Sequence, residues 1–297
     1  MKLIHVFSIF ATVESFFDGQ FKYLTDQGYE VVVVSSYAQN AEAVCKRNGV
    51  RFVPVNIPRS VSPMAIVKAV RKLCLLIREE KVDAVFGHTP VGALCAMIAA
   101  RVCGVKSRVY YRHGVIYTTM QGLKRTIFKA EERFVASLAT SVVNVSYSLS
   151  KLAVIDRLNC VSKQNVIGHG TCGGIDAYDV FNPQWIDNEK FMRLKANLGI
   201  GKPDIVFGFC GRICNDKGIP ELVNAFNMFQ KKHIDLKAKL LLIGIMDERD
   251  ILPQATRDAI KDSKDIVVSG WIKKSEIPYY YSMLDVFVFP SHREGFG

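Results

Sequence analysis

One stretch of the sequence combines two basic side chains with a turn suited to an anion. Gly211 to Gly218 (GRICNDKG) leaves the apolar run 205–210 and enters a segment with Pro220 near its start, a position that the first turn of a helix tolerates. This pattern predicts a strand-to-helix turn whose free backbone N–H groups favour an anion. Arg212 and Lys217 would add the guanidinium and ammonium groups that neutralise and orient a diphosphate. Taken alone, two basic residues in a loop are more often solvated surface.

Two histidines follow apolar runs earlier in the chain. His113 comes after the run 108–111, and His88 comes after the run 83–86. Ligands of open α/β sheets collect at the carboxyl edge, where parallel strands end. A histidine at this edge can accept a proton, hydrogen-bond a sugar hydroxyl, or be a satisfied, partly buried residue, which is the ordinary case. The hypothesis is weaker for His88 than for His113.

Several other chemistries lack their sequence signatures. The chain contains no Walker-type phosphate loop, no G-x-S-x-G nucleophile elbow, no H-x-x-x-H pair and no D-x-D, so we expect no metal ion to hold a diphosphate. A G-x-G-x-x-G spans 168–173, but the residues after it are poor helix sequence, and a dinucleotide site is therefore rejected. Those glycines predict a tight loop instead. The eight cysteines form no C-x-x-C pair, which disfavours zinc and indicates reduced thiols in a cytosolic protein.

Composition limits the class of protein and the kinds of partner. The chain has 297 residues, of which 49% are hydrophobic, so two domains can each bury a core. The net charge of +11 favours polyanionic partners: nucleotides, phosphates, nucleic acid or an anionic membrane surface. His5 interrupts the apolar N-terminal stretch, so a first strand is expected rather than a signal peptide. The most apolar helical segment, 91–105, is too short to span a membrane.

The order of apolar runs predicts an α/β protein. Runs such as Val31 to Val34 are continuously apolar, as strands of a parallel sheet covered by helices on both faces are. The strands expected in the first half are 2–7, 30–35, 51–55, 83–86, 108–111, 142–145 and 165–167. Those expected in the second half are 205–210, 239–243, 266–269 and 285–289. Helices are expected over 219–231, near 248–262 and over 275–283.

The segment 176–203 is polar and loop-like, and the alternation of strands and helices restarts after it. We therefore predict two doubly wound, Rossmann-like domains, 1–175 and 204–297, joined by a linker region at 176–203. The second domain has about four strands where a doubly wound unit commonly has six, so it is expected to be incomplete.

Two basic helical segments raise the question of a membrane surface. Residues 64–81 and 123–138 each combine an apolar stripe with basic side chains, which are Lys68, Arg71, Lys72 and Arg78 in the first and Lys124, Arg125, Lys129 and Arg133 in the second. An ordinary packed helix with a solvated face accounts for such a pattern. The alternative is a surface for anionic lipid headgroups. Nucleic acid is not an expected partner because no basic–aromatic module of a known kind appears.

The sequence resembles the retaining GT-B glycosyltransferases of glycosyltransferase family 4, which build bacterial capsule, O-antigen and lipopolysaccharide core sugars. The resemblance lies mainly in 211–218 and in 289–297 (FPSHREGFG), and the stretches 16–35 and 112–114 fit the family's first domain. It implies an acceptor-side N-terminal domain and a nucleotide-sugar-binding C-terminal domain. It also implies transfer of a sugar, without a metal, from a nucleotide diphosphate-sugar to a lipid-linked or saccharide acceptor.

The resemblance also implies roles for individual residues. Arg212 and Lys217 would hold the donor diphosphate, and His113 would contact the donor sugar and support the transfer. Glu294 would be the first glutamate of the family's Glu, seven residues, Glu motif, near the transferring sugar. Gly19 would belong to the loop that closes over donor and acceptor. Three residues would bring backbone N–H groups to the diphosphate: Gly295, Phe296 and Gly297.

Departures from the family pattern lead to two alternatives. Gly173 stands where the family often has asparagine, and the second glutamate, expected to grip the ribose, would fall beyond residue 297. The chain is thus expected to be C-terminally truncated, and one alternative is an inactive remnant that binds only membrane or acceptor. Another is a GT-B-fold epimerase of the nucleotide-sugar, against which the turn at 289–297 argues. The expected location is the cytoplasm, with the inner face of the cytoplasmic membrane as a peripheral site.

Overall fold

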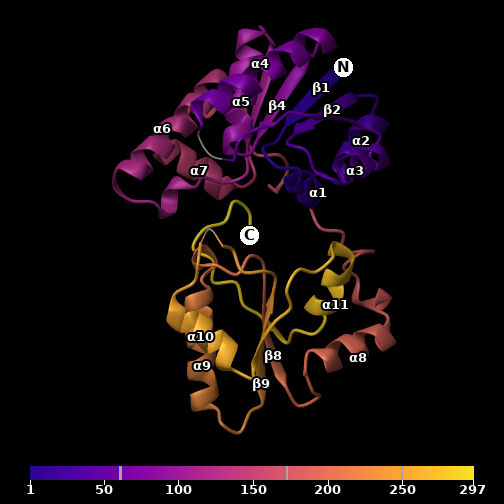
Figure 1. The fold of residues 1–297 in the computed structure, drawn as a ribbon, viewed down its shortest axis with the longest axis vertical. Helices are drawn as coiled ribbons and strands as arrows, with labels where there is room; N and C mark the ends of the chain where they lie inside the picture. Colours follow the sequence, from indigo (N-terminus) through magenta and orange to yellow (C-terminus); the bar gives the residue numbers. More distant parts are fainter. Residues whose placement is uncertain (60–61, 172, 249) are drawn as a thin grey trace. The chain divides into compact units, whose positions relative to one another are not determined.

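The computed structural model describes residues 1–59, 62–171, 173–248 and 250–297. They form two compact units, one of residues 1–174 together with 294–297 and one of residues 175–293 (Figure 1). Each unit is built on one parallel sheet, of seven strands in the first and four in the second. The predicted α/β class with two doubly wound sheets, the second smaller, is confirmed.

The sheet of the first unit has the strand order β3-β2-β1-β4-β5-β6-β7. All of its neighbouring strands run parallel. Its strands are β1 (Lys2–Val6), β2 (Glu30–Ser35), β3 (Arg51–Pro54), β4 (Ala84–His88), β5 (Ser107–Arg112), β6 (Ser141–Asn144) and β7 (Gln164–Asn165). The chain order reverses direction at β1 and β4, which places the carboxyl ends of β1, β4 and β5 side by side at the edge where ligands of such sheets bind.

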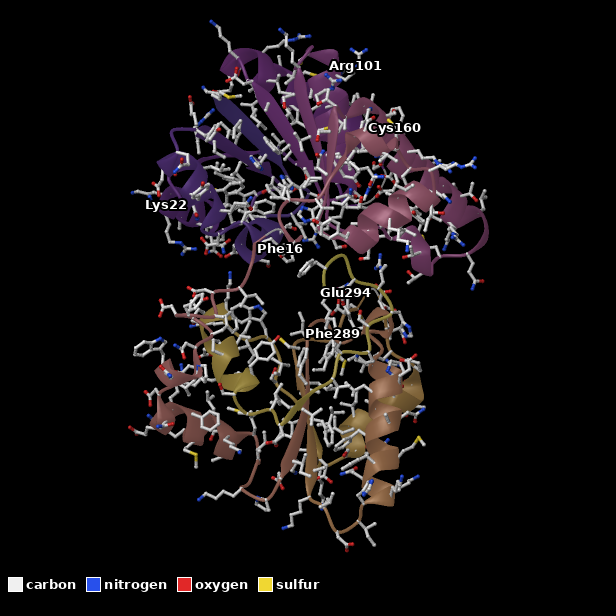
Figure 2. All side chains as sticks on the ribbon, turned by 180° about the vertical axis from the view of Figure 1, so that it is seen from behind. Phe16, Lys22, Arg101, Cys160, Phe289 and Glu294 are labelled. Atoms are coloured by element: carbon white, nitrogen blue, oxygen red, sulfur yellow. The ribbon has the colours of Figure 1, made fainter. Side chains whose placement is uncertain are left out.

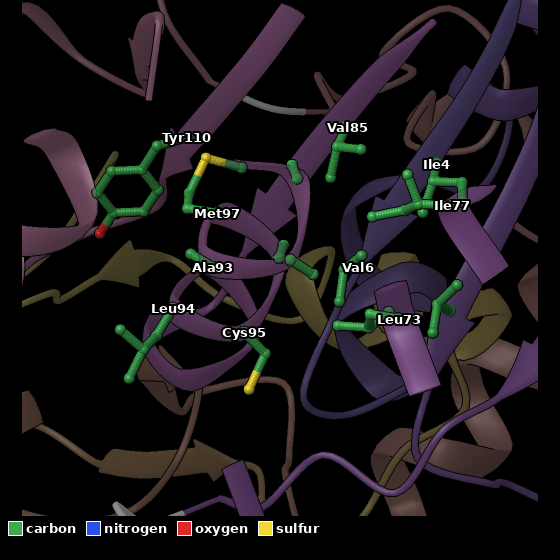
Figure 3. Packing of buried hydrophobic residues seen from close by; sticks show 14 of the residues in the cluster. Ile4, Val6, Leu73, Ile77, Val85, Ala93, Leu94, Cys95, Met97 and Tyr110 are labelled. Atoms are coloured by element: carbon green, nitrogen blue, oxygen red, sulfur yellow. The ribbon is translucent and has the colours of Figure 1, made fainter. Parts of the chain in front are cut away.

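Helices cover both faces of this sheet. One face carries α1 (Ala11–Phe16), α2 (Gln20–Asp26), α3 (Ala41–Arg47) and α7 (Tyr147–Ile155). The other carries α4 (Pro63–Glu80), α5 (Pro90–Val102) and α6 (Gly122–Leu138). Successive side chains of a strand point to opposite faces, so Leu3 and Phe7 pack with the first group of helices. Ile4 and Val6 pack with the second group (Figure 3). This explains why the strands read as continuously apolar.

The second unit repeats the three-layer plan on a smaller scale. Its strand order is β10-β9-β8-β11, all parallel. The strands are β8 (Ile205–Cys210), β9 (Ala238–Ile243), β10 (Ile266–Val268) and β11 (Val286–Phe287). The helices α9 (Ile219–Lys232) and α10 (Gln254–Asp262) cover one face, and α8 (Asn188–Asn197) and α11 (Ile277–Tyr281) cover the other.

The structure differs from the sequence prediction at two helices. The segment 176–203 is not loop throughout, because α8 lies within it. The carboxylate of Asp187 accepts the backbone N–H groups of Glu189 and Lys190 and so caps this helix, and Phe191 packs against the core beneath it. The helix predicted near 248–262 begins only at Gln254, and Arg249 lies outside the described residues.

The structure also bears on membrane-spanning helices and on the cysteines. Within the described ranges, no helix combines the length and the apolar character needed to cross a membrane. Seven cysteines are free thiols, and the eighth, Cys172, lies outside the described residues.

Candidate functional site

The turn from 211 to 218 has the strand-to-helix geometry that its sequence predicts. Strand β8 ends at Cys210, a short 3-10 turn covers Asn215–Lys217, and α9 begins at Ile219. Gly218 sits between the turn and the helix with φ +69°, a left-handed conformation that favours glycine. A Cβ atom there would collide with the carbonyl oxygen of Pro290, so the turn also needs glycine for space.

Acidic side chains hold this turn in shape. Asp250 accepts hydrogen bonds from Asn215 Nδ2 and from the backbone N–H of Asp216, both at 2.8 Å. Asp216 in turn forms an ion pair with Arg293, and its carbonyl accepts the backbone N–H of His292 at 3.0 Å. The turn after β8 and the turn 290–293 after β11 are therefore fixed against each other, as expected for neighbouring parallel strands that end at one edge.

The two basic residues of the turn differ in their surroundings. Arg212 forms an ion pair with Asp247, whose side chain is only 7% exposed, while 47% of the arginine side chain remains exposed. Lys217 Nζ lies 6.0 Å from the ring centroid of Phe289, the aromatic residue labelled in the second unit in Figure 2. Both side chains thus lie at the carboxyl edge of this sheet, close to the helix N-terminus, where a phosphate is favoured.

A small cavity opens beside Arg212 at the same edge. Its volume is about 190 Å³, and Trp271, with a largely exposed ring, forms part of its wall. Its lining consists of Cys210, Gly211, Arg212, Ile243, Gly244, Ile245, Trp271, Ile272 and Ile277. A mostly apolar cavity with an aromatic wall and a neighbouring guanidinium is suited to a flat ring that carries a phosphate.

In the first unit, His113 follows the end of β5 and belongs to a line of three histidines. His5 Nδ1 lies 3.0 Å from His88 Nε2, and His88 Nδ1 lies 3.1 Å from His113 Nε2. Strand register explains the line: His5 is paired with Phe86, two residues before His88, and His88 is paired with Tyr111, two residues before His113. Because residues two apart point to the same face, all three rings share one face of the sheet.

Burial keeps these histidines neutral. It lowers the pKa of His113 to about 4 and that of His5 to about 3, and it also lowers the pKa of His88. The ring of His113 packs with those of Phe16, at 6.2 Å, and Tyr111, at 5.1 Å. At neutral pH, His113 can therefore donate or accept a hydrogen bond but carries no charge.

Arg112, the residue immediately before His113, is buried and forms an ion pair. Its side chain is 0% exposed, and Nε donates to Glu132 on α6 at 3.0 Å. Asn144 and Asn159 accept further hydrogen bonds from its guanidinium, and Tyr110 donates to Glu132 at 3.0 Å. This network fixes the end of β5 and therefore the backbone that carries His113.

The first loop of the chain lies near the same histidine. Gly19 is exposed, has φ +89° at the start of α2, and donates its N–H to Asn48 at 2.9 Å. The exposed Phe16, labelled in Figure 2, packs on His113, and its carbonyl oxygen would be 2.6 Å from a Cβ atom at Gly173. Residues 173–182, which follow the predicted glycine-rich loop, contain no α-helix, and Cys172 lies outside the described residues.

The last four residues group with the first unit. Ser146 Oγ donates to the carbonyl of Gly295 at 2.6 Å, and a Cβ atom at Gly295 would collide with the carbonyl oxygen of His113. The Phe296 ring lies against Gly170. Glu294 and Gly297 belong to the same short segment.

The predicted residues thus form two sets. His113, Gly19 and 294–297 belong to the first unit, and Arg212 and Lys217 belong to the second. Sequence reasoning missed His5 as a partner of His88, and it missed the Arg112–Glu132 pair. The strand order would have supplied the signal for the histidines, since it makes β1, β4 and β5 neighbours. No cluster of three or more potential metal-ligating side chains occurs in the described part of the chain.

Comparison with known proteins identifies the family of both halves. A model described as "Glycosyl transferase 4-like" matches residues 5–146, and one described as "Glycosyl transferases group 1" matches residues 204–297. The capsular polysaccharide biosynthesis glycosyltransferase CapM of Staphylococcus aureus is 28% identical over 297 residues, covering 100% of this chain and 74% of CapM. The UDP-Gal:alpha-D-GlcNAc-diphosphoundecaprenol alpha-1,3-galactosyltransferase of Escherichia coli is 24% identical over 252 residues, covering 82% of this chain and 60% of that enzyme.

Solved structures show the same fold. The Anabaena protein Alr3699/HepE in complex with UDP-glucose matches with a TM-score of 0.74 at 15% identity, covering 98% of this chain and 74% of that one. The first family model matches the N-terminal half of the chain, and the second matches the half that contains the turn 211–218. The chain belongs to the GT-B glycosyltransferases of glycosyltransferase family 4.

Proposed function

We propose that the protein transfers a sugar, with retention and without a metal ion, from a nucleotide diphosphate-sugar to a lipid-linked or saccharide acceptor in bacterial polysaccharide biosynthesis. The observation that carries the proposal is the turn 211–218, which presents Arg212 and Lys217 beside a helix N-terminus and the 190 Å³ cavity. The UDP-glucose bound by HepE supports a nucleotide-sugar donor, and the acceptor named for the E. coli relative supports a lipid-linked one.

The diphosphate and the base of the donor would each meet a matching group in the second unit. The diphosphate would take the turn, where Arg212 would exchange part of its pairing with Asp247 for phosphate oxygens. The base would enter the cavity against Trp271. Departure of the nucleotide diphosphate develops negative charge, which Arg212 and Lys217 would stabilise.

The first unit would supply the groups that act on the sugar. His113 is neutral at pH 7, so it would hydrogen-bond a hydroxyl of the donor sugar rather than act as a cation. Glu294 would lie near the transferring sugar, and the loop with Gly19 would close over donor and acceptor.

Direct binding measurements test the diphosphate site. Arg212→Ala and Lys217→Ala should each weaken UDP binding about 10- to 150-fold, the effect of losing a charged hydrogen bond of about 1.5–3 kcal/mol. Lys232→Ala is the matched control, because it removes an exposed lysine at the far end of α9, about 20 Å along the helix. Titration calorimetry with UDP gives the affinities. Unchanged affinity in both site variants would exclude this assignment, and turnover of any nucleotide-sugar by this chain would exclude the inactive remnant.

We also propose that α6 meets an anionic membrane surface. All residues from 122 to 127 are exposed, including Leu123 at 76% and Ile127 at 55%, and Lys124 and Arg125 lie between them. Apolar side chains beside basic ones are suited to the boundary between headgroups and acyl chains. Leu123→Glu or Ile127→Glu should lower co-sedimentation with phosphatidylglycerol vesicles, whereas Met228→Glu, an exposed control on α9, should not. Equal sedimentation of all variants would contradict the proposal.

A further inference from the structure

The three histidines together carry a fixed number of ring protons. Each ring is neutral because burial lowers its pKa, so the line contains three N–H groups in total. Each of the two hydrogen bonds uses one of them. The third must lie on one of the two terminal nitrogens, Nε2 of His5 or Nδ1 of His113. The state of the buried end therefore decides whether His113 offers a donor or an acceptor at its other end.

Only two arrangements satisfy both hydrogen bonds. In one, every ring carries its proton on Nε2, so that His113 donates to His88 and His88 donates to His5. In the other, every ring carries its proton on Nδ1 and both bonds reverse. A mixed set would place two protons, or two lone pairs, in one of the bonds. The tautomers of the three rings are therefore coupled.

The buried end favours the first arrangement. His5 is 3% exposed, and its Nε2 atom has no hydrogen-bond partner among the described residues. Its ring packs among aromatic side chains, with Phe86 stacked at 4.4 Å and the Phe21 ring at 5.0 Å, inclined by 75° to the imidazole. No hydrogen-bond donor of the described residues meets a bare lone pair at Nε2, whereas an N–H group there can still interact weakly with aromatic π electrons. The Nε2-protonated form is also the commoner tautomer of neutral histidine.

We propose that His88, backed by His5, is a positioning residue that holds His113 as the Nε2–H tautomer and leaves its Nδ1 as a hydrogen-bond acceptor. His113 would then select a ligand group that donates, such as a sugar hydroxyl, and would disfavour a group that can only accept. The meaning of this acceptor for sugar transfer rests on the proposed function, but the tautomer itself does not.

The tautomers can be measured directly. Long-range ¹H–¹⁵N spectra of protein labelled with ¹⁵N-histidine distinguish a protonated ring nitrogen from a bare one, and the six histidines can be assigned by single substitutions. At pH 7, we expect His5, His88 and His113 each to show a protonated Nε2 and a bare Nδ1. Protonated Nδ1 on any of the three would overturn the proposal without any variant.

Two variants test whether His88 sets the state of His113. In His88→Asn, the amide oxygen lies near the former Nδ1 and still accepts from His113, so the spectrum of His113 should stay as in the wild type. In His88→Leu that acceptor is lost, and His113 should show a mixture of both tautomers. An unchanged single tautomer in His88→Leu would mean that His88 only fills space, and would overturn the proposal.

Kinetics separate this inference from the proposed function. If both hold, kcat for sugar transfer should fall about tenfold in His88→Leu and stay within about threefold of the wild type in His88→Asn. The expected spectra together with a protein that turns over no nucleotide-sugar would leave the tautomer assignment standing and refute the proposed function. Turnover together with protonated Nδ1 on His113 would do the reverse.

Discussion

We expect the first unit to lose much of its stability when the buried Arg112–Glu132 pair loses its negative charge. Glu132→Gln keeps the shape of the side chain and one acceptor for Arg112 Nε, and Asn144 and Asn159 still accept from the guanidinium. The variant therefore removes little besides the counter-charge of an arginine that is 0% exposed. Uncompensated buried charges of this kind cost about 3–5 kcal/mol. Burial already raises the pKa of Glu132 against the pull of Arg112, so we expect the lower end, about 3 kcal/mol.

The placement of the tryptophans makes this loss measurable in one unit at a time. Both tryptophans, Trp185 and Trp271, lie in the second unit, so their fluorescence follows its unfolding, whereas far-ultraviolet circular dichroism follows both. In urea, the dichroism transition of the first unit should move down by about 1.5 M for an m value of about 2 kcal/mol/M. The fluorescence transition should stay in place. Glu79→Gln, an exposed glutamate on α4, is the control. A loss below about 1 kcal/mol would mean that Arg112 does not depend on the charge of Glu132.

Three further predictions address the two sites. Gly218→Ala should weaken UDP binding and destabilise the second unit, because its Cβ atom would collide with Pro290. Gly199 has a similar φ of +66° but open space around it, so Gly199→Ala should cost only the backbone strain of about 1 kcal/mol. Equal losses of stability in urea unfolding would contradict the steric argument. Trp271→Ala should weaken UDP binding at least about fivefold by calorimetry and leave pyrophosphate binding unchanged. Equal weakening of both ligands would mean that the base does not bind in the cavity. The pKa values of His5 and His113 are lowered to about 3 and about 4, so the unfolded chain binds more protons than the folded one below pH 6.5. The first unit should therefore lose stability as the pH falls from 6.5 towards 4, by on the order of 1.4 kcal/mol per pH unit for each of these histidines. An unchanged urea midpoint over this range would contradict this expectation.

The fold was largely predictable because its strands are buried on both faces. A continuously apolar strand such as Val31 to Val34 has no polar face to expose to water, so it must be buried on both faces. The order of such strands along the chain already implied two parallel sheets. The helix α8 was missed because its apolar side chains, Phe191 and Leu194 among them, are few and its sequence is otherwise polar. Only the capping residue Asp187 marked its start.

The local geometry of the candidate site was predictable where polar or charged residues come directly after an apolar strand in the sequence. The turn 211–218 and His113 have this form, and the structure gives both the local geometry expected of them. The partners of His113 and Arg112 could not be found in the same way, since His5, His88 and Glu132 are far from them in sequence. Their contacts depend on which strands become neighbours and on which face of α6 meets the sheet.

Helix α6 links an exposed surface to the interior in a mechanical sense. Its first turns carry the exposed Leu123, and nine residues later, about 14 Å along the axis, Glu132 holds the guanidinium of Arg112. A helix is a stiff element, so a ligand that shifted the exposed end of α6 would also shift Glu132. Arg112 is the residue before His113, so such a shift would also act on the position of the histidine.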